Sequence, residues 1–276
     1  MRTAVVTGAG SGLGRAIALE LAKRGYRVHA TDVDGEAAAR TAEEIGGEAE
    51  SSRLDVREEN ACGLLAEALA RDGSLDVWVN NAGVLISGPS WEQSAEQRQT
   101  MLDVNARGLM NGTVAALGPM RSAGRGHVIN VVSLAGIIAA PGEVAYSASK
   151  HAAIAFTLGT AFDLRLAGIR GIELSAVCPD GIWTPMLEDR LDDPDVAGSF
   201  SGRLLTAGEV AAAVGKLTER PRPLTILPRW RGPQLRLLDL FPTLALRLLP
   251  LIMWDARRRQ KRYKRLIENG RWPKSQ

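Results

Sequence analysis

The chain has 276 residues, 45% of them hydrophobic and 24% charged, the balance of a soluble globular protein with a substantial core. Two distant cysteines, the lack of an 18-residue apolar run and a strand pattern at the N-terminus argue against a disulfide framework, a metal site, a membrane-spanning helix and a signal peptide. We therefore expect a cytoplasmic protein. The net charge of +3 is uneven: residues 1–228 hold 21 basic and 28 acidic side chains (net −7), whereas residues 229–276 hold 13 and 3 (net +10).

Short β-branched or apolar runs alternate with helical patterns as far as residue 228. The expected strands cover residues 4–6, 27–31, 50–54, 76–79, 127–132, 171–177 and 224–227. The helical stretches include residues 13–24, 36–45, 58–71, 95–120 and 146–166. This order predicts an α/β fold, a Rossmann-type doubly wound seven-stranded parallel sheet in a catalytic domain of residues 1–228, with a C-terminal helical extension at 229–276. Such sheets bind ligands at the rim formed by the carboxyl ends of their strands.

The first turn reads TGAGSGLG, residues 7–14, between the first strand and the first helix. Glycines there let the backbone approach a pyrophosphate, and the helix N-terminus supplies free N–H groups. Asp32, at the end of the second strand, could accept hydrogen bonds from a ribose and would repel the extra phosphate of NADP, so NAD is favoured. An N-cap for the helix beginning near Gly35 is the alternative role of Asp32 or Asp34.

Five segments together resemble the short-chain dehydrogenase/reductase family. They are the TGxxxGxG spacing, LDV at 54–56, NNAG at 80–83, Asn105, and Ser133 followed by YSASK at 146–150. The resemblance covers residues 1 to about 228 and implies a nicotinamide-dependent oxidoreductase. The implied cofactor contacts are Gly8, Ser11, Gly12, Leu13, Gly14, Asp32, Asp55, Val56, Asn80, Ala82, Gly83, Tyr146, Lys150, Pro179, Ile182 and Thr184. The implied catalytic residues are Asn105, Ser133, Tyr146 and Lys150.

Tyr146 and Lys150 stand four residues apart on an expected helix, so their side chains share one face. A tyrosine titrates near about 10, and a neighbouring ammonium together with the positive nicotinamide of oxidised cofactor would lower that pKa and make Tyr146 a general acid/base. Ser133 would hold the reacting oxygen, and the resemblance gives Asn105 a water that links Lys150 to solvent. A solvated helix face is the alternative for the Tyr–Lys pair. At the level of the whole protein, the alternatives are a non-catalytic dinucleotide-binding regulator and an NADP-dependent carbonyl reductase.

The expected substrate walls are apolar. Ile137 and Ile138 follow Ser133, and Met186 and Leu187 begin the loop after Thr184. A lipophilic secondary alcohol or ketone fits such walls, although the stretch around Ile137 could also be core packing. The chain departs from the family pattern at Asp180, where the family has glycine and where a carboxylate would bring negative charge near the nicotinamide.

The C-terminal extension is apolar first and basic afterwards. Residues 233–254 are interrupted by charges and by Pro242 and Pro250, which would break or kink a helix, so a bilayer-spanning helix is not expected. Seven of residues 257–265 are Lys or Arg. We expect residues 233–265 to bind an anionic membrane surface at the inner face, with packing on the body or a neighbouring subunit as the alternative. Nucleic acid is disfavoured because the body is acidic, and the resemblance implies a homodimer or homotetramer.

Overall fold

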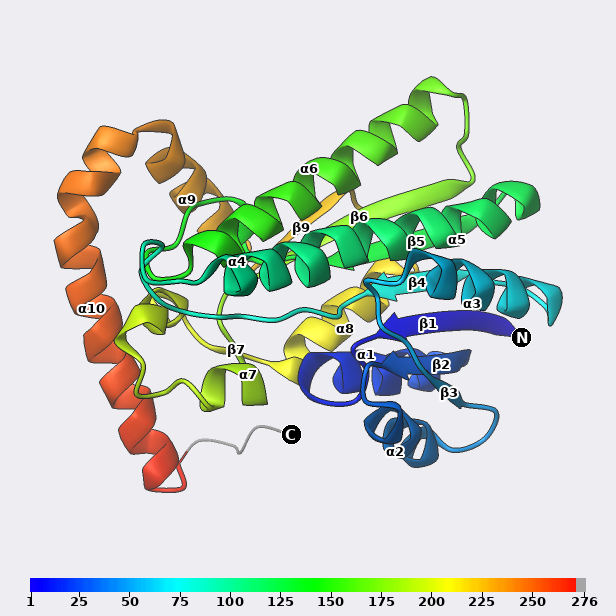
Figure 1. The fold of residues 1–276 in the computed structure, drawn as a ribbon, viewed down its shortest axis with the longest axis horizontal. Coiled ribbons are helices and arrows are strands. Elements are labelled where there is room, and N and C mark those ends of the chain that lie inside the picture. The colour runs from blue at the N-terminus through cyan, green and yellow to red at the C-terminus, as the bar shows by residue number, and fades with distance from the viewer. Residues whose placement is uncertain (272–276) are drawn as a thin grey trace.

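The computed structural model, which describes residues 1–271, is built around seven parallel strands whose carboxyl ends all point to the same rim (Figure 1). The strand order is β3-β2-β1-β4-β5-β6-β9, so the chain winds outward in both directions from β1 and β4, and the predicted doubly wound sheet is confirmed. The strands are β1 (Arg2–Thr7), β2 (Tyr26–Asp32), β3 (Glu50–Arg53), β4 (Val77–Asn80), β5 (Gly126–Val131), β6 (Ile172–Pro179) and β9 (Leu224–Leu227).

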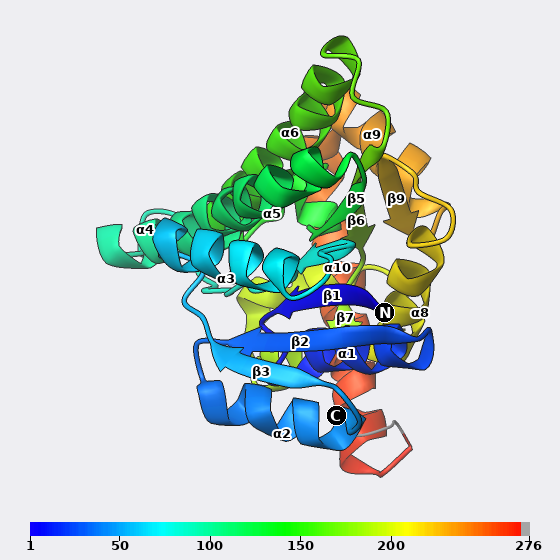
Figure 2. The ribbon, with the colours of Figure 1, turned by 90° about the vertical axis from the view of Figure 1, so that its right-hand side faces the viewer.

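Helices cover both faces of the sheet, as Figure 2 shows. One layer is formed by α1 (Gly12–Lys23), α2 (Gly35–Ile45) and α8 (Ala207–Leu217), and the other by α3 (Glu59–Arg71), α5 (Leu109–Ala123) and α6 (Val144–Leu166). The strands β1, β4, β5 and β6 are almost wholly buried because helices cover both of their faces, whereas the edge strand β3, with the sequence ESSR, is polar and partly exposed. On α1, the helical spacing of Ile17 and Leu21 places both side chains on the sheet, where each is fully buried.

The helical stretch expected at residues 95–120 consists of three parts. Helix α4 (Ala95–Leu102) runs into a π-helical turn, η1 (Asp103–Gly108), and α5 continues from it. Asn105 lies inside this turn and is buried. Its side chain binds both backbone polar groups of Val84, at 2.7 Å from the Val84 nitrogen and 2.8 Å from its oxygen. Single π-helical turns inside α-helices often occur at functional sites, and this one carries Asn105.

The segment after β6 folds over the rim of the sheet. Two short strands, β7 (Ile182–Trp183) and β8 (Leu205–Thr206), pair with each other and bring the ends of residues 185–204 together. These residues, here called the substrate loop, contain α7 (Pro185–Glu188) and the 3₁₀ helix η3 (Pro194–Phe200). The small sheet was not expected from the sequence because two-residue strands leave no periodic pattern.

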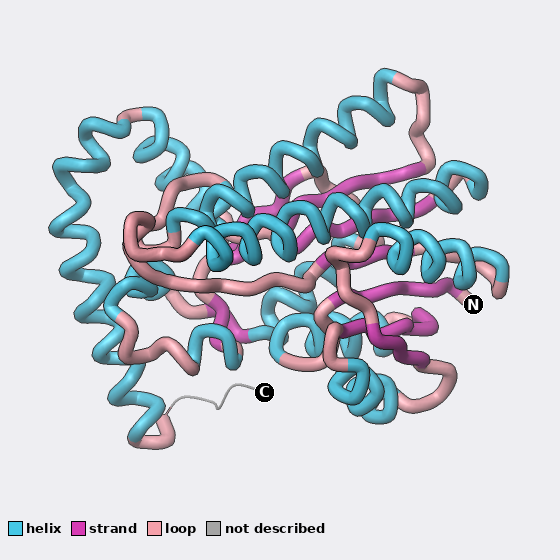
Figure 3. Tube along the Cα trace, in the orientation of Figure 1, coloured by secondary structure: helices cyan, strands magenta, loops and turns pink. Residues whose placement is uncertain are grey.

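The extension forms two helices, α9 (Arg231–Leu240) and α10 (Pro242–Glu268). Pro242 begins α10 at a position where its missing N–H costs nothing, whereas Pro250 is accommodated inside the helix. Figures 1 and 3 show α10 standing at the side of the molecule toward which the strands point. Within residues 1–271, no helix combines the length and the apolar character that crossing a bilayer requires.

The second half of α10 packs on the substrate loop. Tyr263 joins an apolar cluster around Phe200, with the two ring centroids 6.1 Å apart, and its hydroxyl accepts a hydrogen bond from the backbone N–H of Leu204. Gln260 donates to the carbonyl oxygen of Asp193 at 2.7 Å, and Lys264 forms an ion pair with Asp192. The alternative of packing on the body therefore holds for this half of α10.

A buried ion pair joins the start of the extension to the sheet. Nε of Arg231 lies 2.8 Å from Oδ2 of Asp180, and both side chains are less than a tenth exposed. The N–H is not aligned with the oxygen, so the contact is ionic and lacks hydrogen-bond geometry. Burial raises the pKa of Asp180, and the guanidinium of Arg231 opposes that rise. Arg231 also donates to Ser201 and Gln234, which ties three segments of the chain together.

Removing one partner of this pair should destabilise the protein strongly. Arg231→Ala leaves a buried carboxylate without its cation, and we expect the free energy of unfolding, measured by urea denaturation, to fall by about 3–5 kcal/mol. Arg229→Ala, at an exposed neighbouring position, is the matched control and should change it by less than about 0.5 kcal/mol. Adding Asp180→Asn to Arg231→Ala should recover part of the loss. Equal free energies of unfolding for Arg231→Ala and Arg229→Ala would show that the ion pair of Asp180 and Arg231 does not hold the extension.

Candidate functional site

The glycine loop between β1 and α1 forms one end of a large cavity at the rim. Gly8 and Gly12 have φ of 64° and 52°, values that favour glycine. A β-carbon on Gly14 would lie 1.9 Å from the carbonyl oxygen of Gly8, so the strand and the helix can approach only because Gly14 has no side chain. Ser11 caps α1 without a side-chain hydrogen bond. The loop and the N–H groups that begin α1 thus form a cradle that fits a pyrophosphate.

Asp32 ends β2 at the same rim and lines this cavity. Its two carboxylate oxygens accept backbone hydrogen bonds from Gly10 at 2.9 Å and Asp34 at 3.0 Å. The cap of α2 is Asp34, whose side chain accepts from the N–H groups of Glu36 and Ala37. The alternative N-cap role for Asp32 is therefore taken by Asp34, and the Asp32 carboxylate is held in place at the cavity wall.

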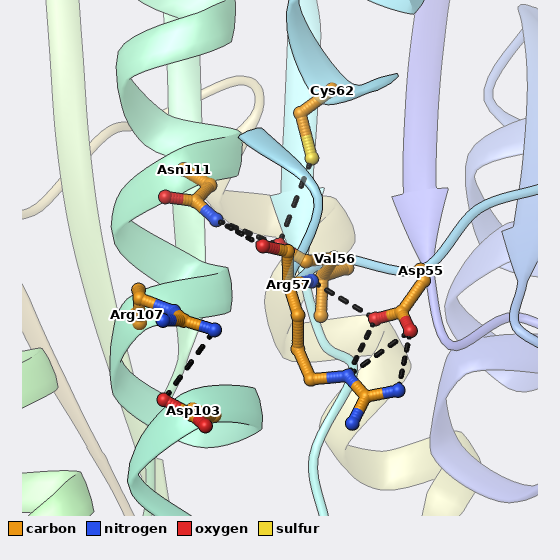
Figure 4. Close-up of polar contacts among 7 residues, drawn as sticks. All are labelled: Asp55, Val56, Arg57, Cys62, Asp103, Arg107 and Asn111. Carbon is orange, nitrogen blue, oxygen red and sulfur yellow. Dashed lines mark hydrogen bonds and ion pairs between the residues drawn. The ribbon is translucent and has the colours of Figure 1, made fainter. Parts of the chain in front are cut away.

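The LDV segment lies beside Asp32 and is fixed by side chains from two helices (Figure 4). The carbonyl oxygen of Val56 accepts a hydrogen bond from Asn111 of α5, and the thiol of Cys62 on α3 points to the same oxygen. Asp55 forms a two-pronged ion pair with Arg57, which lowers the pKa of Asp55. Asp55, Val56 and Arg57 all line the cavity, and Arg57 was not anticipated from the sequence.

In the NNAG segment, Asn81 takes the position that was expected for Asn80. Asn80 ends β4, and its buried side chain points to α5 and forms hydrogen bonds with Trp78, Thr113 and Asn130. Successive residues of a strand point to opposite sides, so Asn81 faces the cavity instead. Its amide donates to the carbonyl oxygens of the glycine loop, at 3.1 Å from both. Ala82 and Gly83 line the cavity as expected.

Ser133, Tyr146 and Lys150 lie close together, and all three line the cavity. Ser133 follows β5, and Tyr146 and Lys150 lie one turn apart near the start of α6. The Lys150 nitrogen lies 5.6 Å from the centroid of the Tyr146 ring and donates to the carbonyl oxygen of Val131 at 3.3 Å. A solvated helix face is ruled out for Lys150, which is 4% exposed.

Burial controls the titration of these groups. It raises the pKa of Tyr146, with the carboxylate of Glu143 adding to the rise and a side-chain hydrogen bond with Ser133 opposing it. Burial lowers the pKa of Lys150 to about 8. We expected the ammonium together with the positive nicotinamide of oxidised cofactor to lower the pKa of Tyr146; the protein groups by themselves raise it, because the surroundings of the phenol are apolar. Stabilising a phenolate here requires positive charge nearer to the oxygen.

Asn105 lies behind Lys150 and does not line the cavity itself. A β-carbon added to Gly83 would lie 3.2 Å from Oδ1 of Asn105 and 3.6 Å from the Lys150 nitrogen, so both atoms lie on the same side of Gly83. Asn105 also donates to Ser149, whose hydroxyl donates in turn to the carbonyl oxygen of Tyr146. The asparagine therefore connects the segment after β4, at Val84, to the turn of α6 that carries both catalytic candidates.

The expected substrate residues divide between wall and core. Ile138, Met186 and Leu187 line the cavity, as do Pro179, Ile182 and Thr184. Ile137 packs instead against the core cluster around Val132 and Leu235, which is the alternative that the sequence left open for this stretch. The carboxylate of Asp180 is neutralised by Arg231, a partner 51 positions later that no local pattern indicates.

Glu143 is a buried carboxyl group at the cavity wall that the sequence analysis missed. It is 3% exposed and accepts a hydrogen bond from Ser199 of the substrate loop at 2.8 Å. Burial raises its pKa to about 7. A lone glutamate before a helix gives no sequence signal, and its place beside the cavity depends on how the substrate loop folds over α6. Within residues 1–271, no group of three or more His, Cys, Asp or Glu side chains is placed to hold a metal ion.

Comparison with known proteins agrees with this geometry. The family model of short chain dehydrogenases matches residues 2–195. The chain belongs to the short-chain dehydrogenase family. A cyclopentanol dehydrogenase from Comamonas testosteroni is 37% identical over 208 residues, which cover 74% of this chain and 82% of the relative.

Two solved structures of similar proteins carry a nicotinamide cofactor. A short-chain dehydrogenase/reductase from Burkholderia phymatum in complex with NAD has a TM-score of 0.77 and 29% identity, covering 88% of this chain and 95% of that one. A structure from Beutenbergia cavernae with NADP at low occupancy has a TM-score of 0.72 and 30% identity, covering 82% and 94%. The protein is thus an oxidoreductase of an NAD(P)-dependent family, as the resemblance implied.

Proposed function

We propose that this enzyme transfers a hydride between NAD and a neutral, lipophilic secondary alcohol or its ketone. The observation that carries the proposal is the set of Ser133, Tyr146 and Lys150, here called the catalytic centre, which lines a cavity with largely apolar walls. Lys150 is the one cation at this centre among the described residues that is not held by a carboxylate, and it is buried. Because the proposed reaction uses Lys150 itself, an anionic group beside the reacting carbon would lack a second cation as its partner.

The glycine loop, Asp32, Asn81 and Gly83 would hold the dinucleotide, and Thr184 would meet its nicotinamide end. Bound NAD supplies the hydride acceptor and, in its oxidised form, a positive charge. Ser133 would donate a hydrogen bond to the substrate oxygen and hold it against Tyr146. Tyr146 would take the hydroxyl proton during oxidation and return it during reduction. Lys150, together with that positive charge, would offset the burial that raises the pKa of Tyr146.

Loss of the phenol should separate binding from turnover. In Tyr146→Phe, only the proton-transfer group disappears, so we expect kcat to fall by at least 100-fold, at the low end of the effect of a general acid/base. The affinity for NAD, measured by fluorescence titration, should stay within about twofold. A variant that keeps a tenth of wild-type activity would contradict the assignment. Unchanged behaviour in every assay would favour a non-catalytic dinucleotide-binding regulator.

Asp32 would set the choice of cofactor. Its carboxylate would accept from the ribose hydroxyls of NAD and repel the additional phosphate of NADP, and the basic Arg57 nearby is already paired with Asp55. This arrangement favours NAD over an NADP-dependent carbonyl reductase.

In Asp32→Ala, kcat/KM should fall for NAD and rise for NADP, so that the ratio of kcat/KM for NAD to kcat/KM for NADP falls by at least tenfold. Steady-state kinetics with both cofactors measure it, and Asp34→Ala, which removes the α2 cap beside the cavity, is the control. Equal use of both cofactors by the wild type would refute the role.

The same enzyme would sit on the cytoplasmic face of a membrane through its extension. Large apolar side chains that are at least a third exposed gather on α9 and the first half of α10: Leu237, Leu240, Phe241, Leu244, Leu246, Leu248, Leu251 and Trp254. Six cations among residues 257–265 are exposed farther along the same helix. An apolar end followed by a basic segment suits insertion below anionic headgroups, at about 1 kcal/mol for each cation near the surface.

Liposome sedimentation tests this membrane contact. The protein should bind vesicles that contain phosphatidylserine, and binding should weaken as salt rises. Leu244→Glu with Trp254→Glu should abolish it, whereas Leu64→Glu, at an exposed leucine of α3, should not. If the wild type and the double variant were recovered in the supernatant to the same extent, the proposed membrane contact would be rejected.

A homodimer or homotetramer would form through the helix pair α5 and α6, as the family resemblance implies. Val114 of α5 and Phe162 and Leu166 of α6 are more than half exposed. Apolar side chains on two adjacent long helices are the composition that such an interface buries.

A further inference from the structure

The catalytic cavity does not end at the reacting centre. It has a volume of about 1250 Å³ and continues past Tyr146 and Asp180 to the inner sides of α9 and α10. A pocket for a single small ligand measures about 300–1,000 Å³, so this cavity has room for a dinucleotide and for a second, elongated molecule.

Apolar side chains of the extension line this additional arm. On α9 they are Leu235 and Leu238, and on α10 they include Ala245, Leu249 and Met253. These residues are buried or half-buried on the side of each helix that faces the body. The helical spacing of Ala245, Leu249 and Met253, four residues apart each time, makes one continuous strip along α10.

The charged groups that line the arm lie mostly at its two ends, and the exposed Asp239 of α9 also borders the cavity. At its inner end, the ion pair of Asp180 and Arg231 neutralises both charges, and Arg231 also binds Gln234. At its outer end, Asp255 pairs with Arg259 at 2.7 Å. Between these two ends the lining strip of α10 carries no charge. An occupant would thus meet hydrocarbon along the α10 side of the arm.

Resting on the proposed oxidoreductase activity, we propose that this arm, lined by Leu235, Leu238, Ala245, Leu249 and Met253, holds a long hydrocarbon chain of the substrate. The substrate class is then a long-chain secondary alcohol or ketone, with the reacting carbon near one end of the chain at Tyr146 and the tail under α9 and α10. The arm and the catalytic centre belong to one continuous cavity. A hydrocarbon chain attached to the reacting carbon would therefore extend from the catalytic centre into the arm, and this favours the substrate itself as the occupant.

Chain length is the variable that tests the arm. With NAD and 2-alkanols of four to fourteen carbons, kcat/KM should rise about fourfold per methylene, the factor that corresponds to about 0.8 kcal/mol for each buried CH₂, until the arm is filled. Activity that rises to six carbons and then stays level would overturn the arm while leaving the proposed reaction intact. No turnover of any alcohol or ketone would instead refute the proposed reaction.

A substitution inside the arm gives the second measurement. Ala245→Trp fills the strip, and we expect the ratio of kcat/KM for 2-dodecanol to that for 2-hexanol to fall by at least tenfold. Leu244→Trp, one position away and half-exposed on the outer side, should keep the wild-type ratio. Calorimetric binding of 2-dodecanone with reduced NAD should weaken in Ala245→Trp only. If that variant does not fold, the wild-type length series decides, and equal ratios in two folded variants would overturn the proposal.

Discussion

The carboxyl ends of seven parallel strands must meet at one rim, and every feature of the site depends on this constraint. The end of β1 is joined to the loop after β4 by Thr7, whose hydroxyl accepts from the backbone N–H groups of Asn81 and Ala82 at 3.0 and 3.1 Å. Neighbouring β5 brings Ser133 to the same rim. The glycine loop, the asparagine segment and the serine thus converge although about 125 residues separate the first from the last. No one of these segments would form a site alone.

The ion pair of Asp180 and Arg231 adds the extension to this arrangement. Where the family pattern has glycine, Asp180 needs a cation because an unpaired buried carboxylate is costly. Arg231 supplies it from the first turn of α9, and the pair consequently fixes where the extension leaves the sheet. The departure from the family pattern and the presence of the extension therefore form one structural feature, and the charge expected near the nicotinamide is neutralised.

The sequence predicted those parts of the fold and site whose signals are local. The alternation of short apolar runs with helical stretches located the seven strands. The glycine loop and the spacing of Tyr146 and Lys150 indicated which residues gather at the rim of the sheet. The sequence could not show that Asn81, and not Asn80, faces the cavity, because this depends on the exact end of β4. A shift of one residue there reverses the direction of a side chain. Glu143 and Arg231 gave no signal because their partners lie 56 and 51 positions away. Long-range pairs of single side chains leave no periodicity to detect.

The way the substrate loop is held indicates where a substrate would enter. The loop is tied to the body by Glu143 with Ser199, and by Ser87, whose hydroxyl donates to Asp193 at 2.5 Å. On its outer side, Gln260 and Tyr263 of α10 bind it as well. Opening the loop would break all four contacts, whereas the first half of α10 has exposed apolar side chains and few polar bonds to the body. The end of the cavity along this half is therefore the less costly route, and it is also the part of the molecule that would lie against lipid.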